Sequence, residues 1–182
     1  MENVKKKGST WQTLAIGAKL LLICAIVAGV VSFLYTLTAE QYEKNIQQTK
    51  NAAIGEIFSL TDLSTVTLPY SGEETVYKVT QGEKIVGYCV EVKSAGFGGD
   101  IEMMVGYTAD KRVLGVSIIA LSETPGLGAK VAEDAFLSQY EGKGGALVLG
   151  SDVDAVSGAT ISSRAVTDGV NRATEALQTA LK

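Results

Sequence analysis

The sequence predicts an α+β domain attached to a single membrane-spanning helix. Three features predict this fold: an uncharged apolar run near the N-terminus, alternating apolar and polar stretches in the middle, and a helical apolar stripe near the C-terminus. The chain has 182 residues, of which 46% are hydrophobic and 20% are charged, which suits one compact domain beside the apolar run. We therefore divide it into a basic N-terminus at 1–12, a membrane helix at 13–37, a helical connection at 38–60 and a domain at 61–182.

The apolar run from Leu20 to Leu37 contains no charged residue. At about 1.5 Å per residue it spans roughly 27 Å, close to the thickness of the hydrocarbon core of a bilayer. A cleaved secretory signal is the alternative, but the run is longer than a usual signal core, and no small-x-small cleavage pattern follows it. Because Lys5, Lys6 and Lys7 precede the run, the positive-inside rule predicts a cytoplasmic N-terminus and a domain outside the cytoplasm.

The segment after the anchor is polar and has helical character. Residues 40–57 are rich in Gln, Lys, Ala and Glu, with apolar residues at Ile46, Ala53, Ile54 and Ile57. This pattern predicts a helix that continues out of the membrane. Its simplest role is that of a spacer between the anchor and the domain.

Alternating residues predict the strands of the domain. Period-two alternation in 86–92 and 101–108 predicts two half-buried strands. The run 113–121 is apolar on both faces, as expected of a central strand that is covered on both sides. Turn residues at 82–83 and 109–110 predict hairpins, so we expect an antiparallel meander.

Two helices are predicted after the strands, at 131–140 and at 163–181. The second helix carries apolar residues at steps of three or four, which gives one stripe that can pack on the sheet. The stripe consists of Val166, Val170, Ala173, Leu177 and Leu181.

The composition excludes several kinds of chemistry. Histidine is absent, which rules out histidine-dependent catalysis and histidine metal ligands. Cys24 and Cys89 form no C-x-x-C pair, so we expect neither a disulfide nor a metal site, and we interpret Cys24 as a packing residue. The net charge of −4 argues against nucleic-acid binding, which needs a basic face. We expect no catalytic residue, and any unusual chemistry would come from a cofactor.

Three segments, 96–100, 123–128 and 157–160, contain more glycine and small polar residues than ordinary turns need. Glycine lets a backbone approach a flat or charged ligand closely, so such loops can form a cofactor pocket. Taken singly, each is better explained as a plain connection. The first does not match the dinucleotide fingerprint G-x-G-x-x-G, and the chain has no Walker A sequence.

The segment 157–160 leads directly into the last predicted helix. Ser162 and Ser163 are candidate N-cap residues, and the N–H groups of the first turn would stabilise a phosphate carried by Thr160. From the spacing alone, a loop that simply leads into a capped helix is the better explanation. The spacing therefore does not identify a ligand.

The glycine-rich segments together resemble a known family. SGATIS at 157–162, ETPGLGAK at 123–130 and GFGGDI at 96–101 are similar to the FMN-binding domain shared by the G subunit of the Rnf electron-transport complex and the C subunit of the sodium-pumping NADH:quinone reductase. The resemblance implies that a separate flavin transferase joins FMN through its phosphate to Thr160 and that the 123–128 loop lies over the flavin. The implied cofactor contacts beside Thr160 are Ser157, Gly158, Ala159, Glu123, Thr124, Leu127, Gly128 and Lys130.

The short chain favours the Rnf protein, because the quinone-reductase counterpart is generally longer. The resemblance then implies an electron-carrying subunit of a complex that couples ferredoxin:NAD electron transfer to sodium or proton transport. Its partners would be the other membrane and iron–sulfur subunits. Two further alternatives stay open: a stand-alone extracytoplasmic flavin reductase, and a non-redox binding module in which Thr160 is unmodified.

Overall fold

The computed structural model describes residues 9–182, without the side chains of 9, 10, 12, 13 and 37–44. The basic cluster expected in the segment 1–12 lies outside the described residues. The chain divides into two compact units, with the boundary between Ile46 and Gln47. The compact unit that contains the sheet therefore begins inside the segment that we expected to be a connection.

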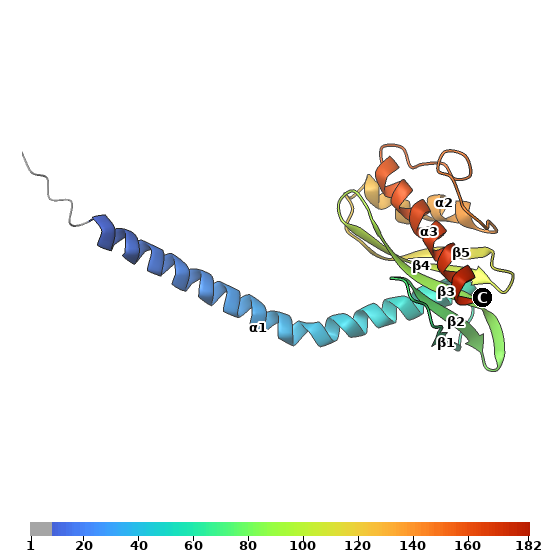
Figure 1. Ribbon diagram of the computed structural model, residues 1–182, viewed down its shortest axis with the longest axis horizontal. Coiled ribbons are helices and arrows are strands. Elements are labelled where there is room, and N and C mark those ends of the chain that lie inside the picture. The colour runs from blue at the N-terminus through green and yellow to red at the C-terminus, as the bar shows by residue number, and fades with distance from the viewer. Residues whose placement is uncertain (1–8) are drawn as a thin grey trace, which may run out of the picture. The chain divides into compact units, whose positions relative to one another are not determined.

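The helix α1 runs without interruption from Ser9 to Phe58 (Figure 1). Its portion Leu14–Thr36 is 23 residues long with a mean hydropathy of 2.6, so its length and composition suffice to cross a membrane. The prediction of one N-terminal apolar helix that continues past residue 37 is confirmed.

Five antiparallel strands form one sheet in the order β1-β2-β3-β4-β5. Both predicted hairpins are present, and Gly82, with φ of 61°, adopts the left-handed conformation that the tight β2–β3 turn requires. The predicted α+β class with an antiparallel meander is confirmed. The strands are β1 Leu63–Thr67, β2 Thr75–Gln81, β3 Lys84–Ala95, β4 Asp100–Thr108 and β5 Val113–Leu121.

The long helix α3, Thr160–Ala180, lies across one face of this sheet (Figure 1). Its predicted apolar stripe is confirmed, since Val166, Val170, Ala173 and Leu177 are fully buried in the main core. Leu181 packs against this core while remaining partly exposed.

Three short helices extend the same core where one continuous helix was predicted at 131–140. They are η1 Gly128–Ala132, α2 Asp134–Leu137 and η2 Ser138–Tyr140. The prediction of a single helix is wrong for a geometric reason. Five residues of an α-helix turn by about 500°, so one regular helix would point Val131 and Phe136 in different directions. Both side chains are nevertheless buried in the main core.

The C-terminal turns of α1 cover the opposite face of the sheet. Ile54 and Phe58 are buried there in a second apolar cluster with Cys89 and Met104. The segment 40–57 was expected to be a simple spacer. It is more than that, because the end of α1 forms part of the core. For the same reason the centres of β3 and β4 are covered on both faces, and the expectation of half-buried strands is wrong there.

The strand β5 lies at an edge of the sheet, so the prediction of a central strand is wrong. Both faces of β5 are apolar because each face packs against a different apolar cluster. Val116 and Ile118 pack with the main core on the side of the short helices η1, α2 and η2, whereas Leu114 and Ile119 pack with the second cluster beside the end of α1. A strand that is covered on both faces has this composition even when one edge has no neighbouring strand.

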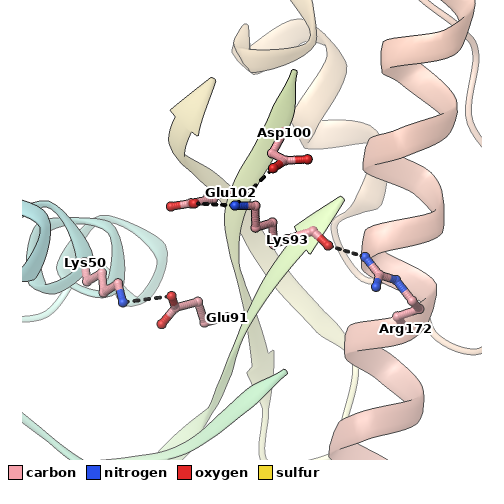
Figure 2. A network of polar contacts seen from close by, with 6 residues as sticks. All are labelled: Lys50, Glu91, Lys93, Asp100, Glu102 and Arg172. Atoms are coloured by element: carbon pink, nitrogen blue, oxygen red, sulfur yellow. Dashed lines mark hydrogen bonds and ion pairs between the residues drawn. The ribbon is translucent and has the colours of Figure 1, made fainter. Parts of the chain in front are cut away.

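Polar contacts on β3 also attach the helices to the sheet (Figure 2). Lys50 Nζ of α1 lies 2.7 Å from Glu91 Oε1, and both side chains are largely buried. From α3, Arg172 donates hydrogen bonds to the backbone carbonyl of Lys93 and, at 3.0 Å, to Ser94 Oγ. The end of α1 is therefore held by charge as well as by apolar packing.

Candidate functional site

The three glycine-rich segments come together at one end of the sheet. Because β4 and β5 pair Ile101 with Leu121, the loops 96–99 and 122–128 leave the sheet side by side. The segment 157–160 joins them where α3 begins. Together the three segments line a cleft of about 360 Å³, within the range typical of small-molecule sites.

The cleft contains most of the contacts that the resemblance implied. Ser157 is exposed next to the cleft but does not line it, and Lys130 lines a separate hollow beside α2. Phe97, Ile161 and Ser162 line the cleft and were not proposed as contacts. The implied contacts that line it are Glu123, Thr124, Leu127, Gly128, Gly158, Ala159 and Thr160.

Three large apolar side chains are exposed around the cleft. Phe97 is 71% exposed, Ile161 is 55% exposed and Leu127 is 47% exposed. Large apolar groups gathered at a concave site are typical of a ligand-binding surface. Two of them could have been noticed in the sequence. Phe97 is an aromatic residue within a glycine-rich loop, and Ile161 does not belong to the apolar stripe of the last helix. Such a rim suits a flat, largely apolar ring.

The helix α3 begins at Thr160, earlier than predicted, and no side chain caps it. The prediction that Ser162 and Ser163 act as N-caps is wrong, because both are buried within the first turn. Ser163 Oγ instead accepts a hydrogen bond from Val156 N–H at 3.0 Å and donates one to the carbonyl of Ala159 at 2.9 Å. Thr160 stays exposed at an uncapped helix N-terminus, where an attached anion is favoured.

Gly158 brings the segment before α3 against the loop 122–128. Its φ of 78° lies in the left-handed region, where residues with a Cβ are strained. A Cβ at this position would also lie 2.9 Å from Leu127 Cδ1. The glycine therefore permits both the turn into Thr160 and the close contact between the two loops.

A buried carboxylate connects the other two loops. Phe97 N–H donates to Glu123 Oε1 at 2.7 Å, and Gly98 N–H donates to Glu123 Oε2 at 3.3 Å. Two N–H groups of the 96–99 loop are therefore bonded within the protein. An incoming phosphate would find its N–H donors at the start of α3 instead.

We expect Ser163→Ala to loosen the segment that carries Thr160. The substitution removes the acceptor of the part-buried Val156 N–H, and the loss of such a hydrogen bond costs about 0.5–1.5 kcal/mol. Urea unfolding should show a free energy of unfolding lower by about this amount. Ser71→Ala removes the hydroxyl of an exposed serine and should leave stability unchanged. Equal stability of both variants would contradict the anchoring role of Ser163.

Comparison with known proteins relates the site to a family of flavin-binding domains. Residues 96–175 match the FMN-binding domain family, and this range includes the whole cleft. The G subunit of the proton-translocating ferredoxin:NAD(+) oxidoreductase complex of Clostridium ljungdahlii is 33% identical over 172 residues, which cover 91% of each chain. The G subunit of the Na(+)-translocating ferredoxin:NAD(+) oxidoreductase complex of Acetobacterium woodii is 29% identical over 204 residues, which cover 98% of each chain.

The fold also resembles a solved structure. The C subunit of the Na(+)-translocating NADH-quinone reductase from Parabacteroides distasonis superposes with a TM-score of 0.51 at 21% sequence identity. The match covers 60% of this chain and 63% of that one. The two proteins therefore share a fold.

Proposed function

Because this chain belongs to the G-subunit family of ion-translocating ferredoxin:NAD(+) oxidoreductase complexes, we propose that it carries electrons on an FMN joined through its phosphate to Thr160. It is an electron-transfer flavoprotein subunit with a domain of the FMN-binding family. The covalent bond to Thr160 is the finer part of the proposal. The observation that carries it is the exposed Thr160 at the uncapped start of α3, inside the cleft.

The described residues fit an FMN group. The Thr160 hydroxyl can form a phosphoester, and the first-turn N–H groups of α3 would stabilise the phosphate charge. Phe97, Leu127 and Ile161 offer apolar surface for the ring system. Gly128 and Gly158 bring the backbone of both segments to the surface of the cleft.

When bound, FMN supplies the redox chemistry, and the protein supplies binding, orientation and exclusion of water. The apolar rim reduces contact between the ring and solvent, while a covalent tether prevents loss of the cofactor. The lining residues include no lysine, arginine or histidine, and their one carboxylate, Glu123, is bonded to backbone N–H groups. No lining residue needs to act as an acid or a base.

The proposed partners are the other membrane and iron–sulfur subunits of such a complex, together with a flavin transferase during maturation. The relatives named as G subunits align with nearly the whole chain, which favours a component of a complex over a stand-alone reductase. Co-purification from the native membrane with iron–sulfur subunits is the expected result. An isolated chain that reduces a small acceptor by itself would favour the reductase.

We also propose that the domain lies outside the cytoplasm, since the basic N-terminus precedes the span Leu14–Thr36. Ser71→Cys places a thiol at an exposed position in the loop between β1 and β2. A membrane-impermeant maleimide added to intact cells or spheroplasts should label this variant, whereas Glu2→Cys should react only after lysis. The reverse labelling pattern would invert the orientation.

In-gel fluorescence tests the central proposal. After denaturing electrophoresis, the chain purified from its native host, or co-expressed with a flavin transferase, should fluoresce under ultraviolet light. A chain that releases free FMN on denaturation would keep the flavoprotein function but lack the covalent bond. A chain without any flavin would favour the non-redox module.

A further inference from the structure

The buried Glu123 carboxylate binds the loop that carries Phe97. Glu123 is only 9% exposed, and its two oxygens accept the N–H groups of Phe97 at 2.7 Å and of Gly98 at 3.3 Å. Among the described residues no lysine or arginine forms an ion pair with it. The contact from Phe97 N–H is short and well within hydrogen-bond range, and the longer one from Gly98 N–H adds to it, so the carboxyl group holds the loop at two successive residues.

Glycines on both neighbouring loops make room for this carboxylate. A Cβ at Gly96 would overlap Glu123 Oε1, and a Cβ at Gly128 would lie 2.5 Å from Oε2. A Cβ at Gly98 would lie 2.5 Å from the carbonyl oxygen of Ser122. These glycines are therefore explained by contacts with Glu123 and Ser122, without any ligand.

Phe97 has little packing of its own to fix its position. Its side chain is 71% exposed, and it stands between Gly96 and Gly98, which are the most conformationally free residues. Burial therefore contributes little to the placement of the ring. Gly96 N–H closes the turn on the carbonyl of Gly99 at 2.9 Å, and the hydrogen bonds to Glu123 fix the two residues between them, Phe97 and Gly98.

We infer that Glu123 is a positioning residue, which holds Phe97 as an apolar wall of the cleft and through Phe97 shields the bound flavin from solvent. The identity of the shielded ligand rests on the function proposed above. The hydrogen-bonded arrangement itself concerns this chain alone. The two parts can therefore be tested separately.

Amide hydrogen exchange tests the first part and needs no flavin. In the full chain, Glu123→Gln leaves one amide oxygen to accept from two N–H donors. Exchange at Phe97 and Gly98, measured at single-residue resolution, should accelerate roughly tenfold or more. Glu83→Gln removes an exposed charge at the β2–β3 turn and should leave that exchange unchanged. Unchanged exchange in Glu123→Gln would overturn the inference.

Iodide quenching of flavin fluorescence tests whether Glu123 acts through Phe97. Glu123→Gln and Phe97→Ala should raise the quenching constant by the same factor, and the double variant should raise it no further. A larger constant in the double variant than in Phe97→Ala would mean that Glu123 affects the flavin independently, which would overturn the inference. If no variant carries flavin, the proposed function fails, while the exchange result still decides the role of Glu123.

Gly98→Ala provides a second route if Glu123→Gln does not fold. Its added Cβ would meet the carbonyl oxygen of Ser122 at 2.5 Å, so the loop must shift while Glu123 stays intact. This variant should reproduce both the faster exchange and the stronger quenching. Wild-type values for both, although the added Cβ displaces the loop, would show that the hydrogen bonds to Glu123 do not hold Phe97 in place and would overturn the inference.

Discussion

Thr160→Ala should eliminate covalent FMN completely while the protein stays folded. The substitution removes the only oxygen in that side chain that could carry a phosphoester. The Thr160 side chain is exposed, and alanine is a better helix former than threonine, so no stability should be lost. In-gel fluorescence should disappear, and intact-mass spectrometry should show only the unmodified chain.

Three further variants make this experiment specific. Thr179→Ala removes an exposed threonine near the other end of α3 and should keep full fluorescence. Thr160→Ser retains a hydroxyl, so it should retain some flavin. Ser157→Ala should weaken flavinylation less than Thr160→Ala does, because Ser157 lies outside the cleft lining. Undiminished fluorescence in Thr160→Ala would move the attachment site to another residue.

Removing the end of α1 should destabilise the domain severely. A chain that begins at Gln47 retains Ile54 and Phe58, whereas a chain that begins at Leu60 loses both. Each buried large apolar side chain contributes about 1.5–3 kcal/mol, so these two account for about 3–6 kcal/mol. Typical domains have a total stability of about 5–15 kcal/mol. The shorter chain should therefore be partly unfolded or aggregate, and the longer one should fold.

Cys89 reports on this effect directly. It is fully buried in the cluster that α1 covers, and burial raises the pKa of its thiol to about 12, because the charged thiolate is disfavoured there. Near pH 8 the thiol of the chain from Gln47 should remain protonated and unreactive towards a thiol reagent until the protein unfolds. The chain from Leu60 should react at once. Equally slow reaction of both chains would contradict the packing role of α1.

Point substitutions in the full chain give a matched comparison. Ile54→Ala should lower the free energy of unfolding by about 2–5 kcal/mol, because it leaves a cavity in the second cluster. Asn51→Ala changes an exposed position on the same helix and should have little effect. Urea unfolding measures both, and equal midpoints would show that the helix end is a spacer after all.

The sequence predicted those elements whose signal is local or periodic. The anchor helix needs only length and apolar composition, and the stripe on α3 needs only helical spacing. The two hairpins follow from their turn residues. The three glycine-rich segments could be identified as a group, although only the resemblance connected them with FMN, because small residues in a loop do not specify a ligand.

The predictions failed where a residue's environment comes from distant parts of the chain. The apolar composition of β5 indicated a covered strand, but composition cannot tell a central strand from an edge strand whose two faces are covered. The serines before position 164 matched an N-cap pattern, yet the hydroxyl of Ser163 bonds to Val156 in the preceding loop. In both cases tertiary contacts outweighed the local preference.

The sequence by itself determined the apolar N-terminal helix, the antiparallel α+β class and Thr160 as the candidate tether, because each depends on neighbouring residues or on a recognisable motif. Only the tertiary structure decided that α1 completes the core, that α3 starts at Thr160, and that Glu123 holds Phe97 beside the cleft. Glu123 and Phe97 are 26 positions apart in the chain. Their hydrogen bond exists because strand register brings two loops to the same end of the sheet, and no local pattern encodes that distance.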